Sequence, residues 1–361
     1  AVKIAIVGTR GIPARYGGFE TFAEELGQRL AARGHAVTVY CRRPHSERFY
    51  LGMRLRYLPA VRHKYLETIS HTALSTLHLL LAPPEVALYC NAANAIFTLW
   101  PRLRGVRVAL NVDGLERRRR KWNQVARAWY RLSERLATLL PDAVVSDAET
   151  IARYYREQYG KQTHFIPYGG AVGKVASREA LERLGLVPGG YFLYVSRMEP
   201  ENNALLVRRA FEQVRTDVRL VMVGDAPYAR RYIAQVRDTR DPRILFPGAI
   251  YGRPYHELQS HCFAYIHATE VGGTHPALVE AMGRGALVLY LDTPENAEVA
   301  ADAGIPFTAE DLPDKLRLAL DMMPEQREAY GRKAMERVRE RYDWERITDA
   351  YERLFEELRG K

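Results

Sequence analysis

The sequence has 361 residues, of which 47% are hydrophobic and 27% charged, so it predicts a folded protein of about two domains and excludes a disordered chain. No apolar run reaches the ~18 residues that a membrane-spanning helix needs, and Cys41, Cys90 and Cys262 are too far apart to predict a disulfide framework or a zinc site. The net charge of +10 is uneven, because residues 1–170 hold 26 basic and 13 acidic side chains whereas residues 171–361 hold 27 and 30.

The first half alternates buried strands with amphipathic helices. Apolar runs predict strands at 2–8, 35–41, 85–91, 107–113 and 142–148. Helical patterns lie between them at 19–33, 66–82, 121–140 and 148–159. Strands that are apolar throughout and separated by helices are typical of a parallel sheet covered on both faces.

The second half repeats this order. Strands are predicted at 191–197, 219–225, 243–248, 262–268 and 286–292, followed by helical patterns near 311–341 and an amphipathic helix at 344–358. The stretch 166–177 is rich in small residues and predicts a linker. We therefore predict an α/β protein of two tandem Rossmann-like, doubly wound domains at 1–168 and 169–342, followed by a C-terminal helix within 343–361.

In open α/β sheets, ligands bind beyond the carboxyl ends of the strands. The first strand leads into a glycine-rich turn, GTRGIPARYGG, before a helix near Phe19. Such a turn predicts an anion site, because free N–H groups and the helix dipole favour negative charge, although an ordinary strand-to-helix turn remains the alternative. NAD is disfavoured, because Arg10 breaks the pattern G-x-G-x-x-G and the second strand ends in Arg42 and Arg43 instead of an acid.

Polar side chains follow the later strands of the first half. Asn91 and Asn94 follow one strand, and Asp113 and Glu116 follow the next. Either acid could orient a sugar hydroxyl or act as a base, and a helix cap or a solvated loop is an equally ordinary role for each.

The basic first half predicts an anionic partner, such as a phosphate, a nucleic acid or a membrane surface. The run Arg117–Lys121, with Trp122, Trp129 and Tyr130 close by, fits a membrane interface. A solvated helix face and the stacking of single-stranded nucleic acid are alternatives. The sequence contains no nucleic-acid recognition motif, so nucleic acid is not expected as a partner.

Two segments of the second half have the composition of a nucleotide site. Arg197 follows the first strand in SRMEPENN, where it can meet a phosphate, and Asn202 lies beside it. Gly248 and Ile250, in FPGAI at the end of the third strand, could line a base pocket with their backbone.

The segment EVGGTHPALVEAM follows the fourth strand of this half. Gly272 and Gly273 permit close backbone approach, and Pro276 suits the first position of a helix. Glu280 comes one turn later on the same face. The arrangement offers amides to a phosphate and a carboxylate to hydroxyls, the two groups that a nucleotide sugar presents; a tight turn with an exposed glutamate is the alternative.

Taken together, GTRGIPARYGGFET, NVDGLE, RMEPENN, VGGTHPALVEAM and DTPENAEV resemble a retaining GT-B glycosyltransferase of family 4 over nearly the whole chain. More narrowly, they resemble the bacterial rhamnosyltransferase-like branch. The resemblance implies a metal-independent enzyme without a cofactor, with a nucleoside-diphosphate sugar as donor, and the sequence contains no Asp-x-Asp. It also implies a donor site on the C-terminal domain, an acceptor site on the N-terminal domain, a reaction in the cleft between them, and a last helix that packs back on the N-terminal domain.

The positions of residues at strand ends, together with the resemblance, predict the following roles. Those expected at the donor are Gly17, Gly18, Arg197, Asn202, Gly248, Ile250, Gly272, Gly273, Thr274, His275 and Glu280. Those expected at the acceptor are Arg15, Tyr16, Asn91 and Asn94. The catalytic set comprises Asp113 and Glu116, which position the acceptor, Arg197 on the diphosphate, and Glu280 on the ribose.

Three positions depart from the family pattern. The first glutamate of the usual Glu-x7-Glu pair falls on Gly272, with Glu270 out of register. Asn202 stands where a lysine is usual, and Asp113 where a histidine is. A sugar site with fewer charged side chains would suit a 6-deoxy sugar.

We therefore expect transfer of rhamnose from dTDP-rhamnose to a saccharide or diphosphate-lipid acceptor in cell-surface polysaccharide synthesis. The alternatives are a UDP- or GDP-sugar donor, or a sugar-nucleotide epimerase. The expected location is the cytoplasm, with a peripheral contact of the basic N-terminal domain at the inner membrane face.

Overall fold

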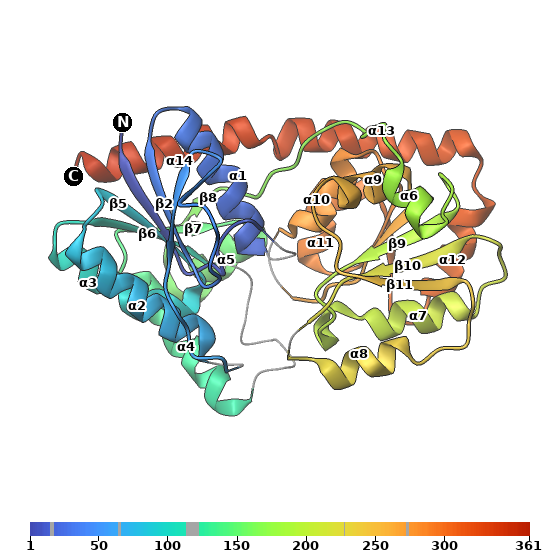
Figure 1. Ribbon diagram of the computed structural model, residues 1–361, viewed down its shortest axis with the longest axis horizontal. Helices are drawn as coiled ribbons and strands as arrows, with labels where there is room; N and C mark the ends of the chain where they lie inside the picture. The colour runs from blue at the N-terminus through green and yellow to red at the C-terminus, as the bar shows by residue number, and fades with distance from the viewer. Residues whose placement is uncertain (15–17, 64–65, 113–122, 227, 272–273) are drawn as a thin grey trace. The chain divides into compact units, whose positions relative to one another are not determined.

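The computed structural model describes residues 1–14, 18–63, 66–112, 123–226, 228–271 and 274–361. The chain divides into two compact units (Figure 1), unit 1 with residues 1–168 and 344–361 and unit 2 with residues 169–343. Each unit holds a largely parallel sheet covered by helices, so the predicted fold of two doubly wound α/β domains is confirmed.

The sheet of unit 1 has the strand order β3-β4-β2-β1-β5-β6-β7-β8. Its strands are β1 (Lys3–Val7), β2 (Ala36–Cys41), β3 (Phe49–Tyr50), β4 (Met53–Tyr57), β5 (Val86–Cys90), β6 (Arg107–Val112), β7 (Ala143–Ser146) and β8 (His164–Phe165). Neighbours pair in parallel except β3 and β4, which form an antiparallel hairpin. Strands β3, β4 and β8 were not predicted from the sequence, because they are short or carry charged side chains near the edges of the sheet.

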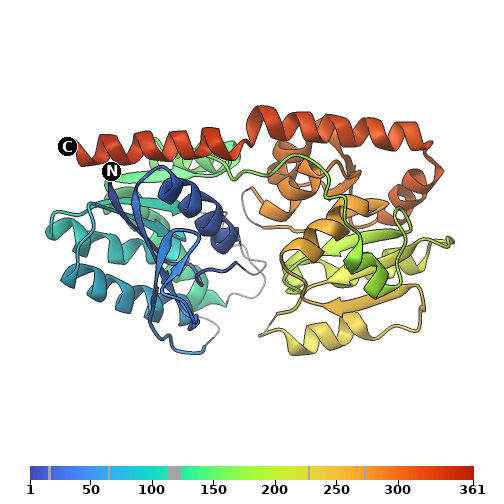
Figure 2. The same cartoon turned by 45° about the horizontal axis from the view of Figure 1, so that its top comes forward.

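Helices cover both faces of this sheet. On one face, α2 (Glu67–Leu81), η1 (Ala92–Thr98), α4 (Gln124–Leu139) and α5 (Glu149–Tyr159) share a core with the strands, and α3 (Leu99–Leu103) continues η1. On the other face, α1 (Gly18–Ala32) and α14 (Trp344–Arg359) pack side by side (Figure 2). Phe22 of α1 and Tyr351 of α14 meet there, with ring centroids 5.4 Å apart.

Helix α14 is an integral part of unit 1, although it follows unit 2 in the sequence. Asn111, at the end of β6, donates a hydrogen bond from its amide to the Tyr351 hydroxyl at 2.8 Å, and both side chains are fully buried. At the surface, Arg33, directly after α1, forms ion pairs with Glu345 and Asp349 at 2.9 and 2.7 Å. The last helix therefore completes the core of the first sheet.

The sheet of unit 2 has the order β11-β10-β9-β12-β13-β14, parallel throughout. Its strands are β9 (Tyr191–Val195), β10 (Arg219–Val223), β11 (Ile244–Gly248), β12 (Ala264–His267), β13 (Val288–Leu291) and β14 (Ile305–Phe307). Its helices are α6 (Glu179–Leu184), α7 (Ala204–Glu212), α8 (Arg230–Arg237), α9 (Arg253–His261), α10 (Pro276–Gly283), α11 (Pro294–Ala300), α12 (Leu312–Asp321) and α13 (Pro324–Arg341), with short turns η3 (Pro200–Asn202) and η4 (Ala301–Ala303). The three-residue β14 was missed from the sequence.

In the parts of the chain that the structure describes, no helix is both long and apolar enough to span a membrane.

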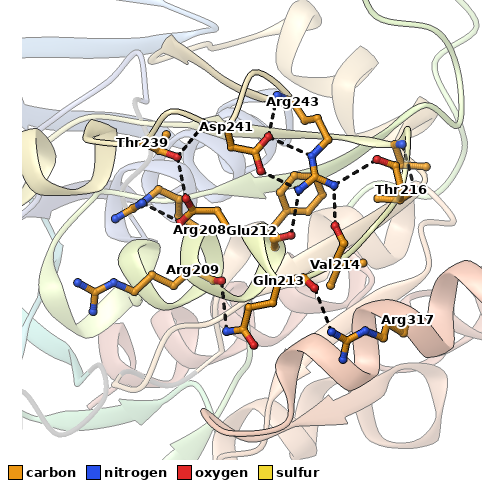
Figure 3. A network of polar contacts seen from close by, with 12 residues as sticks. Arg208, Arg209, Glu212, Gln213, Val214, Thr216, Thr239, Asp241, Arg243 and Arg317 are labelled. Atoms are coloured by element: carbon orange, nitrogen blue, oxygen red, sulfur yellow. Dashed lines mark hydrogen bonds and ion pairs between the residues drawn. The ribbon is translucent and has the colours of Figure 1, made fainter.

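Arg243, directly before β11, connects that segment to the end of α7 (Figure 3). Arg243 donates to both carboxylate oxygens of Asp241, at 3.0 and 2.7 Å, and to the backbone oxygen of Val214 at 2.7 Å. Its guanidinium carbon lies 4.3 Å from the ring centroid of Phe211. The hydrogen bonds from Arg243 hold the pKa of Asp241 below its usual value.

Replacing Arg243 with Ala should lower the free energy of unfolding of unit 2 by about 3 kcal/mol, because a half-buried carboxylate and a helix end lose the donors of its guanidinium. Denaturant unfolding measures this loss. Arg215→Ala, at an exposed arginine, is the control and should change stability by less than about 0.5 kcal/mol. Equal losses of stability in the two variants would contradict the conclusion that the contacts of Arg243 stabilise unit 2.

Candidate functional site

Each sheet has one place where the strand order reverses. It lies between β1 and β5 in unit 1, and between β9 and β12 in unit 2. At such a point, the loops that follow two neighbouring strands lead to opposite faces of the sheet and leave a crevice for a ligand. The loops in question begin at residues 8, 91, 196 and 268, which are the segments that the sequence analysis selected.

In unit 1, the loop after β1 lies directly against the loop after β5. A Cβ atom on Gly8 would lie 2.5 Å from the Cys90 oxygen and 2.7 Å from the Asn94 amide nitrogen, so only glycine fits. Asn94 is fully buried and donates to the Cys90 oxygen at 2.8 Å. The Asn91 side chain accepts from the Ala93 N–H at 3.0 Å and so caps η1. The structure thus brings the glycine loop and both asparagines together.

The amides of the glycine loop donate to groups within unit 1. The Arg10 N–H donates to Glu20 at 2.9 Å, the Gly11 N–H to the Thr9 hydroxyl at 3.1 Å, and the Ala14 N–H to Glu24 at 3.3 Å. Burial raises the pKa of Glu24. These three amides, next to two carboxylates of α1, are therefore unsuited to hold an anion.

Several predicted residues of unit 1 lie outside the described residues. They are Arg15, Tyr16, Gly17, Asp113 and Glu116. Gly18 is the first residue of α1. Asn111, two positions before Asp113, is buried and bonded to Tyr351, so the strand end that leads to Asp113 is held by α14.

In unit 2, Arg197 follows β9 with about one fifth of its side chain exposed, and its guanidinium lies 3.7 Å from the carboxylate of Glu199. The Asn202 side-chain amide donates to the backbone oxygen of Arg197. The Asn202 backbone oxygen accepts from the Tyr194 hydroxyl at 2.6 Å. Asn202 thus holds the loop that carries Arg197, a role that the sequence did not indicate.

Gly224, at the end of β10, sets the path of the same loop. It has a φ of +142°, and a Cβ atom at this position would lie 1.8 Å from the backbone oxygen of Ser196. Its N–H donates to the oxygen of Gly248 at 3.0 Å, which links the ends of β10 and β11. Ile250 is half-exposed just beyond that point. A single glycine directly after an apolar strand, in VMVGD, was the available signal for Gly224.

The segment after β12 joins the loop after β9. Asn203 donates from its amide to the Ala268 oxygen at 2.9 Å and to the Glu270 carboxylate at 3.1 Å. The Glu270 N–H donates to the Glu201 oxygen at 2.9 Å. Glu270, the acid that lies out of register with the family pattern, is therefore part of the junction between the two loops.

Helix α10 begins beside a pair of imidazoles. His275 is its N-cap, Thr274 just before it is buried, and Glu280 lies half-buried on the helix. The ring of His267, at the end of β12, lies 5.1 Å from that of His275. Burial, with a smaller contribution from His275, holds the pKa of His267 well below its usual value, so His267 is neutral. His267 was not identified from the sequence.

The predicted donor residues Gly272 and Gly273 lie outside the described residues. The far end of α10 is fixed to the segment that opens unit 2, because the Gly173 N–H donates to the Gly283 oxygen at 2.9 Å and Arg284 donates to the Gly173 oxygen at 3.1 Å. Gly283 and Arg284, in the second half of the motif EAMGRG, therefore hold α10 against the first segment of unit 2.

Unit 2 thus gathers a guanidinium, a neutral imidazole and carboxylates at one switch point. A planar guanidinium pairs well with phosphate oxygens, and carboxylates accept hydrogen bonds from hydroxyls. Among the residues that the structure describes, no group of three or more His, Cys, Asp or Glu side chains is arranged to hold a metal ion.

Family comparisons match both halves of the chain. Residues 17–169 match the glycosyl transferase 4-like domain, and residues 189–323 match glycosyl transferases group 1. Two such domains in tandem, each on a doubly wound sheet, define a glycosyltransferase of the GT-B fold. The chain is a glycosyltransferase of this kind, with a 4-like first domain and a group 1 second domain. No curated protein matches the chain.

Solved structures share the fold along nearly the whole chain. HepE of Anabaena, in complex with UDP, has a TM-score of 0.77 at 15% identity, covering 98% of this chain and 100% of that one. Sucrose-phosphate synthase of Thermosynechococcus elongatus has a TM-score of 0.78 at 19% identity, covering 99% of each chain. A UDP-forming trehalose-phosphate synthase of Burkholderia vietnamiensis has a TM-score of 0.73 at 11% identity, covering 98% and 100%. At these identities the likeness concerns the fold.

Proposed function

We propose that the chain transfers a sugar, with retention of configuration, from a nucleoside-diphosphate sugar to an acceptor hydroxyl. The observation that supports this most directly is the junction of the β9 and β12 loops, where Arg197 lies on one side and α10 with Glu280 on the other. The complex of HepE with UDP and glucose, on the same fold at 14% identity, adds support for a nucleotide-sugar donor.

In the proposed reaction, the bond between the anomeric carbon and the diphosphate oxygen breaks, and a bond to the acceptor oxygen forms on the same face of the sugar. The acceptor proton passes to the departing phosphate. Arg197 and amides at the start of α10 would stabilise the charge on the diphosphate. Glu280 would accept hydrogen bonds from the ribose, Thr274 and His275 would face the sugar, and Gly248 and Ile250 would line the base.

On the acceptor side, we propose that Asp113 and Glu116 orient the attacking hydroxyl, with Arg15, Tyr16, Asn91 and Asn94 as further contacts. Asn94 is buried and bonded to Cys90, so it would act through the shape of the loop. The excess of basic side chains in residues 1–170 supports a saccharide or diphosphate-lipid acceptor that carries negative charge. Such an acceptor would place the enzyme at the inner face of the cytoplasmic membrane.

Rhamnose from dTDP-rhamnose is our preferred donor, on the strength of the motif VGGTHPALVEAM and of Gly272 and Asn202 in place of charged residues. We propose that transfer is independent of a metal. A UDP- or GDP-sugar is the alternative donor, and a sugar-nucleotide epimerase the alternative enzyme.

Thermal unfolding with dTDP-, UDP- and GDP-sugars tests the donor. A ligand at about 100 times its Kd stabilises the folded state by about 2.7 kcal/mol, so one base class should raise the Tm clearly above the others. If none of these compounds shifts the Tm, the proposed donor is wrong. Conversion of the sugar nucleotide without any acceptor would identify an epimerase instead.

A further inference from the structure

One helical layer of unit 1 exposes large apolar side chains. Helices α2, α3 and α4 lie on the same face of the sheet (Figures 1 and 2). Their exposed apolar residues are Leu74, Leu77, Leu81, Trp100, Leu103, Val125, Leu132 and Leu139. Helices α1 and α14 on the other face, which the structure describes completely, expose no large apolar side chain. The apolar exposure therefore distinguishes this helical layer from the layer of α1 and α14 on the opposite face of the same sheet.

Helix α4 arranges its exposed apolar residues in a stripe. Val125, Leu132 and Leu139 recur every seven residues and are 79%, 49% and 72% exposed. Since seven residues make nearly two turns, the three side chains lie on one side of the helix over about 21 Å. The opposite side of α4, with Ala126, Tyr130 and Ala137, is buried against the sheet. This stripe therefore points away from the core.

A second stripe of α4 is positively charged. Arg127, Arg131 and Arg135 recur every four residues and are all exposed. The single acid of the helix, Glu134, is buried and accepts hydrogen bonds from the hydroxyls of Tyr154 and Tyr159 at 2.8 and 2.7 Å. The solvent side of α4 thus carries positive charge alone. The basic run 117–121 precedes α4 in the sequence but lies outside the described residues.

We propose that the outer side of α4, flanked by the exposed residues of α2 and α3, docks on an anionic phospholipid surface. Adjacent apolar and arginine stripes suit a helix that lies in the membrane interface, with leucines toward the acyl chains and arginines at the headgroups. A second copy docked through the same face would set arginines against arginines, which disfavours self-association. The proposal deepens the proposed function, because it names the surface that would bring the enzyme to a lipid-linked acceptor.

Vesicle co-sedimentation tests this docking surface. The whole protein should sediment with vesicles of equimolar phosphatidylcholine and phosphatidylglycerol, not with phosphatidylcholine alone, and less at high salt. Arg127→Gln/Arg131→Gln should weaken the partition coefficient by about tenfold or more, because each basic residue near an anionic surface contributes about 1 kcal/mol. Leu132→Gln/Leu139→Gln should weaken it similarly through lost insertion of apolar side chains.

Matched controls come from unit 2. Arg209→Gln/Arg215→Gln removes the same charge from exposed positions of unit 2, and Leu318→Gln replaces an exposed leucine of α12. Both should sediment like the wild type. Equal binding to neutral vesicles, unchanged binding of the α4 variants, or a dimer in light scattering that Leu132→Gln/Leu139→Gln converts to a monomer would overturn the proposal. Donor-induced thermal shifts should be the same in all of these variants, so failure of the donor proposal would be seen separately.

Discussion

Arg197→Ala should lower the turnover number of sugar transfer by about 10²- to 10³-fold, the loss expected when one preorganised donor to a developing negative charge is removed. Arg197 follows β9 at the switch point, with a side chain that is mostly buried and 3.7 Å from Glu199. A guanidinium held in this way needs little reorganisation as the diphosphate departs. Steady-state kinetics with the donor identified by thermal shift measures the effect.

Two controls separate charge stabilisation at Arg197 from folding. Arg197→Lys keeps the charge but loses the planar fork, so it should recover only part of the activity. Arg209→Ala, at an exposed arginine of α7, should leave turnover unchanged. The free energy of unfolding of Arg197→Ala should fall by less than about 2 kcal/mol, mainly because the ion pair with Glu199 is lost. Near-normal turnover in Arg197→Ala would exclude Arg197 from the site.

Gly224→Ala should destabilise unit 2 by about 3 kcal/mol or more and abolish the thermal shift caused by the donor. The added Cβ would lie 1.8 Å from the Ser196 oxygen, and the φ of +142° is unfavourable for any residue with a side chain. Relief requires the backbone next to Arg197 to move. Denaturant unfolding gives the stability change, and thermal unfolding with the donor gives the binding change.

Gly189→Ala is the matched control for Gly224→Ala. Gly189 also has a positive φ, +73°, but no atom lies within 4 Å of the position that an added Cβ would take. The control should therefore cost only about 1 kcal/mol, the conformational term alone, and keep the donor response. If both variants lose the same stability and bind the donor equally, close packing at Gly224 does not determine the position of Arg197.

The fold was largely predictable because parallel strands buried on both faces leave a strong signal. Runs such as 85–91 and 219–225 are apolar throughout, and the intervals between them have helical periodicity. The missed strands lacked that signal. In β4, Arg54 and Arg56 interrupt the apolar pattern close to the edge of the sheet, and β8 and β14 are only two and three residues long.

The segments that meet at the candidate site were predictable from the sequence, but the contacts between their side chains were not. Parallel topology alone places the residues after β9 and β12 at one edge. It does not reveal that Asn203 reaches Glu270, 67 positions away, or that His267 packs on His275. Nor does it show that Asn94 and Asn202 direct their amides to backbone oxygens of their own loops. Such pairings depend on side-chain directions, which the spacing of residue types does not encode.

The position of α14 has a consequence for biosynthesis. Trp344, Ile347, Tyr351, Leu354 and Phe355 fill the core beside α1, yet they are translated after every residue of unit 2. During translation, the apolar side chains of unit 1 that α14 covers therefore stay exposed until all of unit 2 has been made. We expect chaperones to be needed while unit 1 lacks α14. The need should end when α14 has been made and packs beside α1.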